Sequence, residues 1–203
     1  MSEIQFMVKP DWVSWEAIHE CLVSGHEYNR KRGVNMVSPT WTPDKLKDYL
    51  KEGYCFVAID KEKVVGTCSL RIIKSKQWWG KGKSVAVTCL DAIVPMYKGT
   101  DVYFGLMNLR NQFINKLGIR IIEFSTHENN KVVQRINLKY GAKYVRYCAF
   151  ADTSHYSVVM VFWLDGCPFS NRYCDFRFKL SKFKTKLIFK PGRKLRFLPF
   201  YKL

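Results

Sequence analysis

Residues 93–103 read IVPMYKGTDVY and connect an apolar stretch to a helical pattern. The preceding residues, 84–94, have the composition of a strand, which Pro95 closes. From Val102 onward, apolar residues recur at helical spacing. A strand, a short basic loop with a glycine and a helix N-terminus form an anion site, because free backbone amides and the helix dipole point toward the ligand. We therefore predict an anion-binding loop here, to which Lys98 adds positive charge.

The rest of the chain alternates helical and strand patterns around this loop. We predict helices over about residues 11–31, 43–52, 102–117 and 130–140. We predict strands over about residues 54–59, 64–72, 84–94, 119–124, 143–150 and 156–164, of which the first two form an antiparallel hairpin. This order predicts one mixed α/β domain rather than an array of repeats.

Composition and charge limit the classes of protein and partner. The chain has 203 residues, 47% hydrophobic and 15% aromatic, which predicts one folded domain rather than a disordered or low-complexity chain. The formal net charge is +17. A charge of this size indicates an anionic partner, whether nucleic acid, a membrane surface, an acidic protein or a phosphorylated cofactor.

The cysteines and the N-terminal residues indicate a compartment. The seven cysteines are odd in number and scattered, and no pair has CxxC spacing, so we expect buried, reduced thiols and a reducing cytoplasm. The first residues lack the basic and apolar regions of a signal peptide, and the longest apolar run, residues 156–164, is too short to cross a bilayer. We expect a soluble, cytoplasmic protein. Metal-binding, Walker and dinucleotide patterns are missing, so no metal is expected.

The anion-binding loop resembles the acetyl-CoA pyrophosphate loop of the GNAT superfamily of N-acetyltransferases, whose pattern is V-x-P-x-Y-R/Q-G-x-G-x-G/A. The positions that match this pattern are Ile93, Pro95, Tyr97, Lys98 and Gly99. Asp101 and Tyr103 stand where the family has glycines, and the Asp101 carboxylate would repel a pyrophosphate. The resemblance implies that acetyl-CoA, or another acyl-CoA, binds as co-substrate at Ile93, Val94, Lys98, Gly99, Thr100, Asp101, Val102 and Tyr103.

A second segment is similar to the same superfamily. The superfamily's pattern N-x-x-A-x-x-L-Y-x-x-x-G-F has the same spacing as the residues Asn130, Val133, Ile136, Asn137, Gly141 and Ala142. In the family the asparagine lies near the pantetheine arm, which here implicates Asn130. The family's tyrosine often protonates the leaving thiolate, but Asn137 occupies that position and cannot act as an acid. Tyr140, one turn further on, is a conceivable substitute.

The resemblance also implies the chemistry of the site. Backbone amides would polarise a thioester carbonyl where the strand over residues 84–94 splays from the strand over 119–124, and an amine would attack after losing a proton. Asp91 on the first of these strands is a candidate base, as are His127 and Glu128 after the second. Each of the three also has a purely structural interpretation, as an ion-paired or loop polar residue.

Two basic segments lie outside these motifs. The loop over residues 74–83 carries Trp78 and Trp79, which either stack on a ligand ring or fold back over a sheet edge. Residues 171–203 hold eleven basic residues and one acid, so +10 of the net charge lies there. Apolar residues of this segment fit one helix face, made of Phe176, Leu180, Phe183 and Leu187. Some of them also alternate with lysines as in a strand, and we predict extended structure with a turn at residues 191–192.

These observations predict a GNAT-like mixed α/β fold with a mostly antiparallel sheet, an acyltransferase domain over residues 1–168 and a basic, aromatic-rich C-terminal extension over 169–203. The predicted reaction moves an acetyl group from acetyl-CoA to an amine of a small molecule or a protein. One alternative is an acidic acyl carrier protein as the acyl donor, which would suit a basic surface. The other is a non-catalytic module that binds nucleic acid or an anionic membrane through its basic segments.

Overall fold

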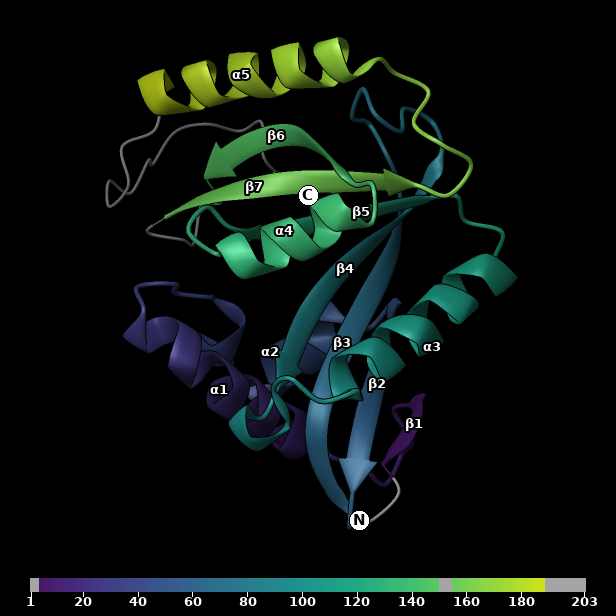
Figure 1. Cartoon of the computed structure of the whole chain (residues 1–203). Helices are drawn as coiled ribbons and strands as arrows, with labels where there is room; N and C mark the ends of the chain where they lie inside the picture. The colour runs from purple at the N-terminus through teal and green to yellow at the C-terminus, as the bar shows by residue number, and fades with distance from the viewer. Residues whose placement is uncertain (1–3, 150–154, 189–203) are drawn as a thin grey trace.

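The computed structural model describes residues 4–149 and 155–188. Within these residues seven strands form one sheet in the order β1-β2-β3-β4-β5-β7-β6. The strands are β1 (Gln5–Val8), β2 (Gly53–Asp60), β3 (Lys63–Lys74), β4 (Ser84–Ile93), β5 (Ile121–His127), β6 (Lys143–Ala149) and β7 (Tyr156–Trp163). Neighbouring strands are antiparallel except β4 and β5, which are parallel. The predicted mixed, mostly antiparallel α/β architecture is confirmed (Figure 1).

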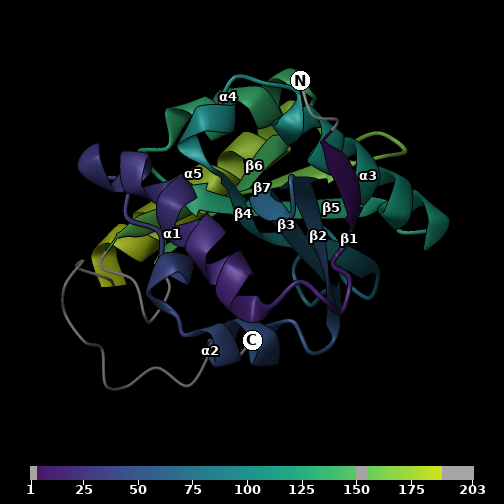
Figure 2. The same ribbon diagram turned by 90° about the horizontal axis from the view of Figure 1, so that it is seen from below.

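Helices cover both faces of the sheet. The α-helices are α1 (Trp15–Lys31), α2 (Pro43–Tyr49), α3 (Val102–Lys116), α4 (Lys131–Lys139) and α5 (Asn171–Ile188). Helices α1 and α2 lie on one face of the first strands and α3 on the other, as the view from below shows (Figure 2). Strand β2 is buried on both sides: Val57 packs with Leu22 of α1, whereas Phe56 packs with Leu106 of α3. Such a strand needs apolar residues on both faces, which explains its continuous apolar sequence.

Local sequence signals set several of these boundaries. Thr42 accepts a hydrogen bond from the Lys45 amide and Pro43 begins α2, as the Thr-Pro pair predicts. Ser14 accepts from the Ala17 amide at the start of α1. Strands β2 and β3 pair as the predicted hairpin.

Two parts of the fold differ from the prediction. Strand β1 was not predicted; it adds four residues to the outer edge of β2. The predicted extended structure after residue 170 is wrong over residues 171–188, which form helix α5. Residues 189–203, with the predicted turn at 191–192, lie outside the described residues.

Helix α5 covers the edge of the sheet formed by β6. The Tyr147 amide donates to Oγ of Ser181 at 2.9 Å, and Oγ1 of Thr185 donates to the Tyr147 carbonyl at 2.8 Å. The outward-facing backbone groups of Tyr147 are thereby satisfied by helix side chains rather than left open to another strand. Figure 1 shows α5 as the outermost element beyond β6.

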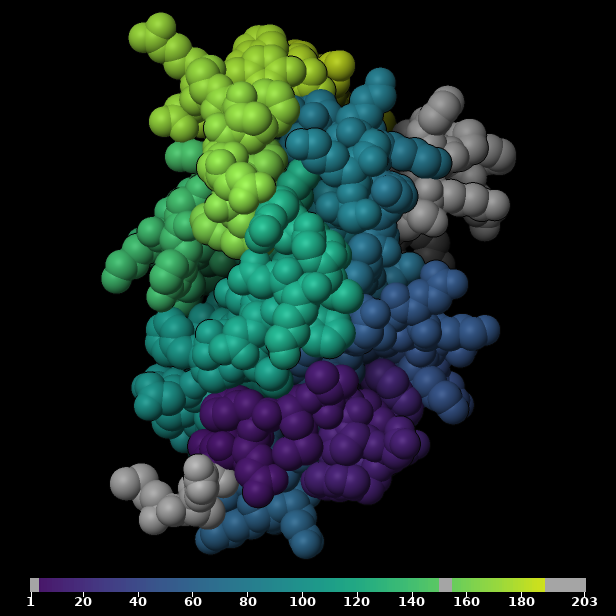
Figure 3. Space-filling view, turned by 90° about the vertical axis from the view of Figure 1, so that its right-hand side faces the viewer, coloured from purple at the N-terminus to yellow at the C-terminus, as the bar shows by residue number. Residues whose placement is uncertain are grey.

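The two tryptophans of the basic loop pack against the rest of the protein. Trp79 is 2% exposed, and its indole N–H donates to Glu123 on β5 at 2.9 Å. Trp78 makes edge-to-face contacts with Phe169 and Tyr173 near the start of α5. In the structure the two tryptophans therefore fold back over the sheet, which was one of the two interpretations of the sequence. Figure 3 shows the loop and the C-terminal helix region side by side at one end of the molecule.

The remaining sequence-level expectations concern cysteines and membrane spans. All seven cysteines are free thiols, and five of them are buried. Among residues 4–149 and 155–188, no helix is both long and apolar enough to cross a bilayer.

Candidate active site

The parallel strands β4 and β5 diverge and leave a V-shaped opening in the sheet. In the described part of the chain, their ladder consists of two registered pairs, Ala86 with Ile122 and Val87 with Glu123. Beyond these pairs, β4 stays paired with β3 and β5 stays paired with β7 up to His127. Each arm of the opening is therefore held on its outer side, and its inner edge faces the other arm without a ladder partner. Figure 1 shows the two strands separating toward the side of α1 and α4.

A bulge shapes the β4 arm. The β3–β4 register shifts between Thr67 and Ser69, and Leu90 has a φ of 55°, in the left-handed region that a branched residue rarely adopts. Such strain persists only where surrounding packing fixes it, and it re-aims the residues on either side. The residue after the bulge is Asp91.

The predicted anion-binding loop follows β4 directly. Ile93 pairs with Gly66, and the Val94 amide donates to the Val65 carbonyl at 3.0 Å, so both residues close the strand. A short 3-10 helix, η2 (Pro95–Tyr97), leads into Gly99, whose φ of 83° favours glycine. The hydroxyl of Thr100 donates to the Tyr97 carbonyl at 2.6 Å.

Helix α3 begins at the end of this loop. Asp101 occupies its N-cap position but makes no side-chain cap hydrogen bond. The first amides of a helix have no partner within the helix and can bind an anion. The Val102 amide donates to Oγ1 of Thr100 at 3.4 Å, so the Tyr103 amide is the candidate for an anion here. The exposed carboxylate of Asp101 stands at the same place and opposes that anion.

Lys98 does not direct its charge at the helix N-terminus. Its ammonium donates to the Gly25 carbonyl of α1 at 2.9 Å and lies 4.8 Å from the ring centre of Tyr28. Burial lowers the pKa of Lys98. Gly25 itself leaves no room for a side chain, because a Cβ there would lie 2.9 Å from the Ile93 carbonyl. Lys98 therefore ties the loop to α1, which the sequence did not indicate.

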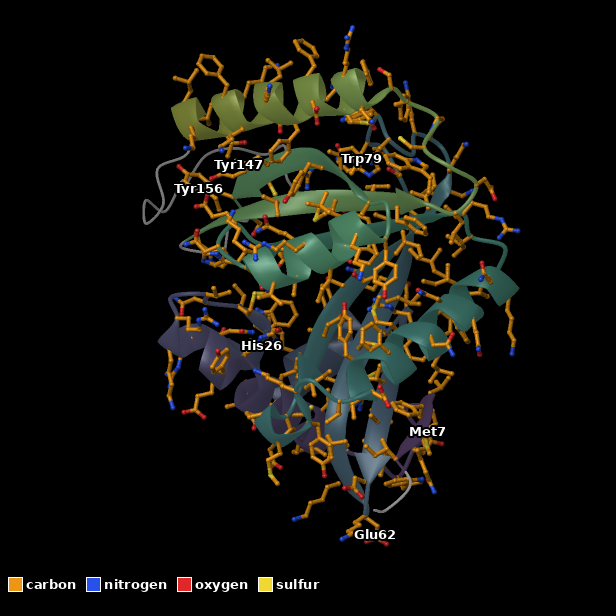
Figure 4. The ribbon with its side chains drawn as sticks, viewed as in Figure 1. Met7, His26, Glu62, Trp79, Tyr147 and Tyr156 are labelled. Carbon is orange, nitrogen blue, oxygen red and sulfur yellow. The ribbon has the colours of Figure 1, made fainter. Side chains whose placement is uncertain are left out.

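His26 lies beside this contact, on the inner side of α1 (Figure 4). It is 9% exposed, and its Nδ1 is 3.2 Å from the amide nitrogen of the Asn29 side chain. Burial, with the nearby charge of Lys98, lowers the pKa of His26 to about 4. The imidazole is therefore neutral at pH 7. The ring also hydrogen-bonds to the backbone of Asp91.

Asp91 is paired with a buried arginine. Nη1 of Arg110 donates to both carboxylate oxygens of Asp91, at 3.0 and 2.8 Å. The Arg110 side chain is 0% exposed and that of Asp91 is 36% exposed. Neighbouring Asp91 raises the pKa of Arg110 despite its burial, so the guanidinium stays charged. Sequence reasoning missed Arg110, although it stands four residues from both Leu106 and Ile114 in the buried stripe of α3.

Two tyrosines accompany this ion pair. Burial, followed by the charge of Asp91, raises the pKa of Tyr103 to about 12, so its hydroxyl keeps its proton. Tyr140, the proposed substitute for the family's tyrosine, lies near Tyr103 and is 60% exposed at the end of α4. Asn137 is 6% exposed on the same helix. Tyr103 thus lies near enough to Asp91 and to Tyr140 to be influenced by the charge of either.

The β5 arm ends at His127, which is 4% exposed and stacks on His155 with ring centres 4.2 Å apart. Its Nδ1 accepts a hydrogen bond from the Asn129 amide at 3.0 Å, which places the ring proton on Nε2. Burial lowers the pKa of His127. A neutral ring in this tautomer has no free lone pair at Nε2 with which to accept a proton.

The polar residues after β5 form a separate network. Glu128 accepts from the Tyr147 hydroxyl at 2.5 Å, and burial together with this hydrogen bond raises the pKa of Tyr147. Figure 4 shows Tyr147 beneath α5 with Tyr156 beside it. Asn130 caps α4 by accepting from the Val133 amide and donates to Thr126 at 3.0 Å. These contacts hold the start of α4 against the end of β5.

The candidate bases occupy opposite arms of the opening. Asp91 lies four residues beyond the paired Val87, and His127 lies four residues beyond the paired Glu123. Two cavities, of about 530 and 510 Å³, lie elsewhere, one beside Trp15 and Tyr54 and the other beside Gly118 and Arg120. We assign the site to the opening because the strand divergence, the helix N-terminus and the ion pair meet there. No group of metal-ligating side chains occurs among the residues that the structure describes.

Several solved acetyltransferases have a similar architecture. One from Streptococcus agalactiae is 18% identical, with a TM-score of 0.60 over 79% of this chain and 98% of that chain. A GNAT-family acetyltransferase from Streptococcus pneumoniae is 10% identical, with a TM-score of 0.57 over 80% and 99% of the two chains. The ribosomal-protein-S18-alanine N-acetyltransferase of Escherichia coli is 10% identical, with a TM-score of 0.61 over 80% and 94%. No family model matches the sequence, and a search of curated proteins finds no match either.

Proposed function

The chain has the GNAT fold, and on that basis we propose that it is an N-acyltransferase that moves an acetyl group from acetyl-CoA to an amine. The observation that carries the proposal is the V between β4 and β5, whose inner edges keep backbone N–H and C=O groups free of ladder partners beyond Val87 and Glu123. The pantetheine arm of CoA contains amides, which can bond to a free strand edge as an added strand does. The N-terminus of α3 then receives the pyrophosphate.

The proposed site offers acetyl-CoA backbone amides, whereas its charged side chains do not favour the pyrophosphate. The Tyr103 amide at the first turn of α3 suits a pyrophosphate, and Gly99 lets the loop turn into the helix. Asp101 repels the same group, and the Lys98 ammonium bonds to Gly25 instead. We therefore expect weak binding of acetyl-CoA. An acidic acyl carrier protein is the alternative donor, because it would deliver its acyl group with less dependence on the pyrophosphate site.

Asp91 is the proposed proton acceptor. In the reaction the amine nitrogen forms a bond to the acyl carbon while the carbon–sulfur bond breaks, so one proton leaves the amine and one joins the thiolate. Asp91 is partly exposed and its carboxylate is fixed by Arg110, whereas His127 is buried with its lone pair at Nδ1 engaged. Glu128 is bonded to Tyr147. Tyr140 is the proposed donor to the thiolate, and backbone N–H groups near the bulge would polarise the carbonyl.

Thermal unfolding in the presence of acetyl-CoA tests donor binding. We expect millimolar acetyl-CoA to raise the Tm of the wild-type protein and to have no effect on Gly99→Glu, because a carboxylate then crowds the anion site. Gly166→Glu is the matched control: Gly166 has a φ of 88° and, like Gly99, has open space at its Cβ position. Equal Tm increases in both variants would contradict the assigned loop, and no increase in the wild type would contradict acetyl-CoA as the donor.

Transfer itself is measured as release of free CoA thiol with a panel of primary amines and peptide N-termini. Asp91→Asn keeps a hydrogen-bond acceptor for Arg110 but removes its counter-charge, so we expect a lower basal Tm. We also expect kcat to fall by about 10²- to 10⁴-fold while acetyl-CoA still raises the Tm. Glu128→Gln is the control carboxamide and should keep most of the activity. A reversal of these two results would move the base to the β5 arm.

A further inference from the structure

Helix α5 has an inner face packed on the sheet and an apolar face on its opposite side. The inner face carries Cys174, Phe178, Ser181 and Thr185, at spacings of four, three and four residues, and it packs on β6. At 100° per residue, the residues opposite these are Phe176, Leu180, Phe183 and Leu187. Two stripes on opposite sides of one helix cannot both contact the sheet.

The outer stripe is exposed. Phe176 is 60% exposed, Phe183 64% and Leu187 69%, so three large apolar side chains share one accessible face. Figure 4 shows side chains rising from the outer side of α5, away from the sheet. A contiguous apolar stripe of this kind marks a binding surface more often than an isolated exposed residue does.

Cations border the stripe on both sides. Arg172, Lys179 and Lys186 recur every seven residues and form one row beside it, and Lys184 lies along the other side. These four side chains are exposed. Residues 171–188 contain six basic residues and one acid, Asp175, which gives the helix a net charge of +5.

We propose that the outer face of α5 binds the surface of an anionic lipid bilayer. Phe176, Phe183 and Leu187 would enter the boundary between headgroups and acyl chains, and the flanking lysines would reach the lipid phosphates with their alkyl stems along the bilayer surface. The helix lies parallel to the sheet edge and is anchored to it through Ser181 and Thr185, so it can lie in the plane of the interface without leaving the fold.

The exposed apolar stripe and the flanking cations of α5 together indicate which kind of partner binds this face. A second copy of the chain would place +5 against +5 on an isologous contact, and this repulsion disfavours a dimer through α5. A nucleic acid would use the cations but would leave the leucine and most of the phenylalanine surface in water. An anionic bilayer accepts both the apolar stripe and the rows of positive charge.

Co-sedimentation of the full chain with lipid vesicles tests this inference. We expect binding to vesicles of phosphatidylcholine with phosphatidylserine and much weaker binding to phosphatidylcholine alone. Phe183→Ser/Leu187→Ser should weaken binding by at least about tenfold, because each removes buried apolar area. Lys179→Glu/Lys186→Glu should weaken it by at least about 25-fold, since each cation near an anionic surface contributes about fivefold.

Matched controls lie on other helices. Val132→Ser/Leu138→Ser changes two exposed apolar residues of α4, and Lys116→Glu/Lys139→Glu makes the same charge change at exposed lysines of α3 and α4. Both controls should bind vesicles as the wild type does, and circular dichroism should show that all four variants are folded. Three results would overturn the proposal: no binding to anionic vesicles, loss of binding in the charge variant alone, or binding to duplex DNA in place of vesicles.

Discussion

The carboxylate of Asp91 on β4 accepts two hydrogen bonds from Nη1 of Arg110, which is completely buried in α3. The pair joins the residue after the β4 bulge to the helix that begins at the proposed anion site. A buried guanidinium without an anion is strongly unfavourable, whereas a carboxylate at the surface can be hydrated. The two partners are therefore unequal: Arg110 depends on Asp91 more than Asp91 depends on Arg110.

This inequality predicts that substitutions of the two partners lower stability by unequal amounts. Asp91→Ala should lower the free energy of unfolding by about 3–5 kcal/mol, because it leaves the buried charge of Arg110 without a partner. Arg110→Met removes that charge and keeps an apolar side chain of similar length, so it should cost less than Asp91→Ala. The double variant should be more stable than Asp91→Ala alone. Urea unfolding of the four proteins measures the cycle, and additive costs would contradict the interpretation.

His26 predicts loss of stability in acid. Burial lowers its pKa from 6.5 to about 4, so the folded state favours the neutral ring. The unfolded chain then binds more protons, and the contribution of His26, about 3 kcal/mol, is present above pH 6.5 and is lost as the pH falls toward 4. Unfolding free energies of the wild type and of His26→Gln should therefore converge between pH 6.5 and 4. A constant difference between pH 8 and pH 4 would contradict this assignment.

The parts of the fold that the sequence predicted well are those with local signals. The Thr42–Pro43 start of α2 and the β2–β3 hairpin depend on neighbouring residues only. Strand β1 has four residues and exists through its pairing with β2, about fifty residues away, so no local pattern marks it. The sequence of α5 fits both a helical and a strand pattern. The contacts of Ser181 and Thr185 with Tyr147, which is distant in sequence, favour the helix.

In the candidate site, too, the features with local sequence signals were predictable and those that depend on distant residues were not. The strand, glycine turn and helix start around Gly99 follow from the sequence, and the structure has all three. The direction of the Lys98 side chain does not follow, because its partner Gly25 is 73 residues away. Arg110 left a readable signal, since a cation between Leu106 and Ile114 in an apolar stripe needs a buried anion.

The charges around the α3 N-terminus predict opposite effects of two substitutions on donor binding. Asp101→Asn removes an exposed anion from the position that receives the pyrophosphate and should strengthen acetyl-CoA binding by about fivefold, as expected for about 1 kcal/mol between charges in water. Lys98→Met should change the affinity less, because the ammonium is bonded to Gly25. Isothermal titration gives both affinities. If Lys98→Met were the more damaging change, Lys98 would turn toward the ligand when it binds.

The contacts between α5 and Tyr147 predict that the helix protects the sheet edge. Ser181→Ala and Thr185→Val each leave one backbone group of Tyr147 without its partner, and each should lower the free energy of unfolding by about 1–3 kcal/mol. Ser125→Ala, at an exposed position of β5, is the control and should change it by no more than about 0.5 kcal/mol. A chain ending at residue 170 exposes the β6 edge and should form oligomers in size-exclusion chromatography, whereas a chain ending at residue 188 keeps α5 and should not. If the shorter chain were monomeric and as stable as the longer one, α5 would not be needed to cover the β6 edge.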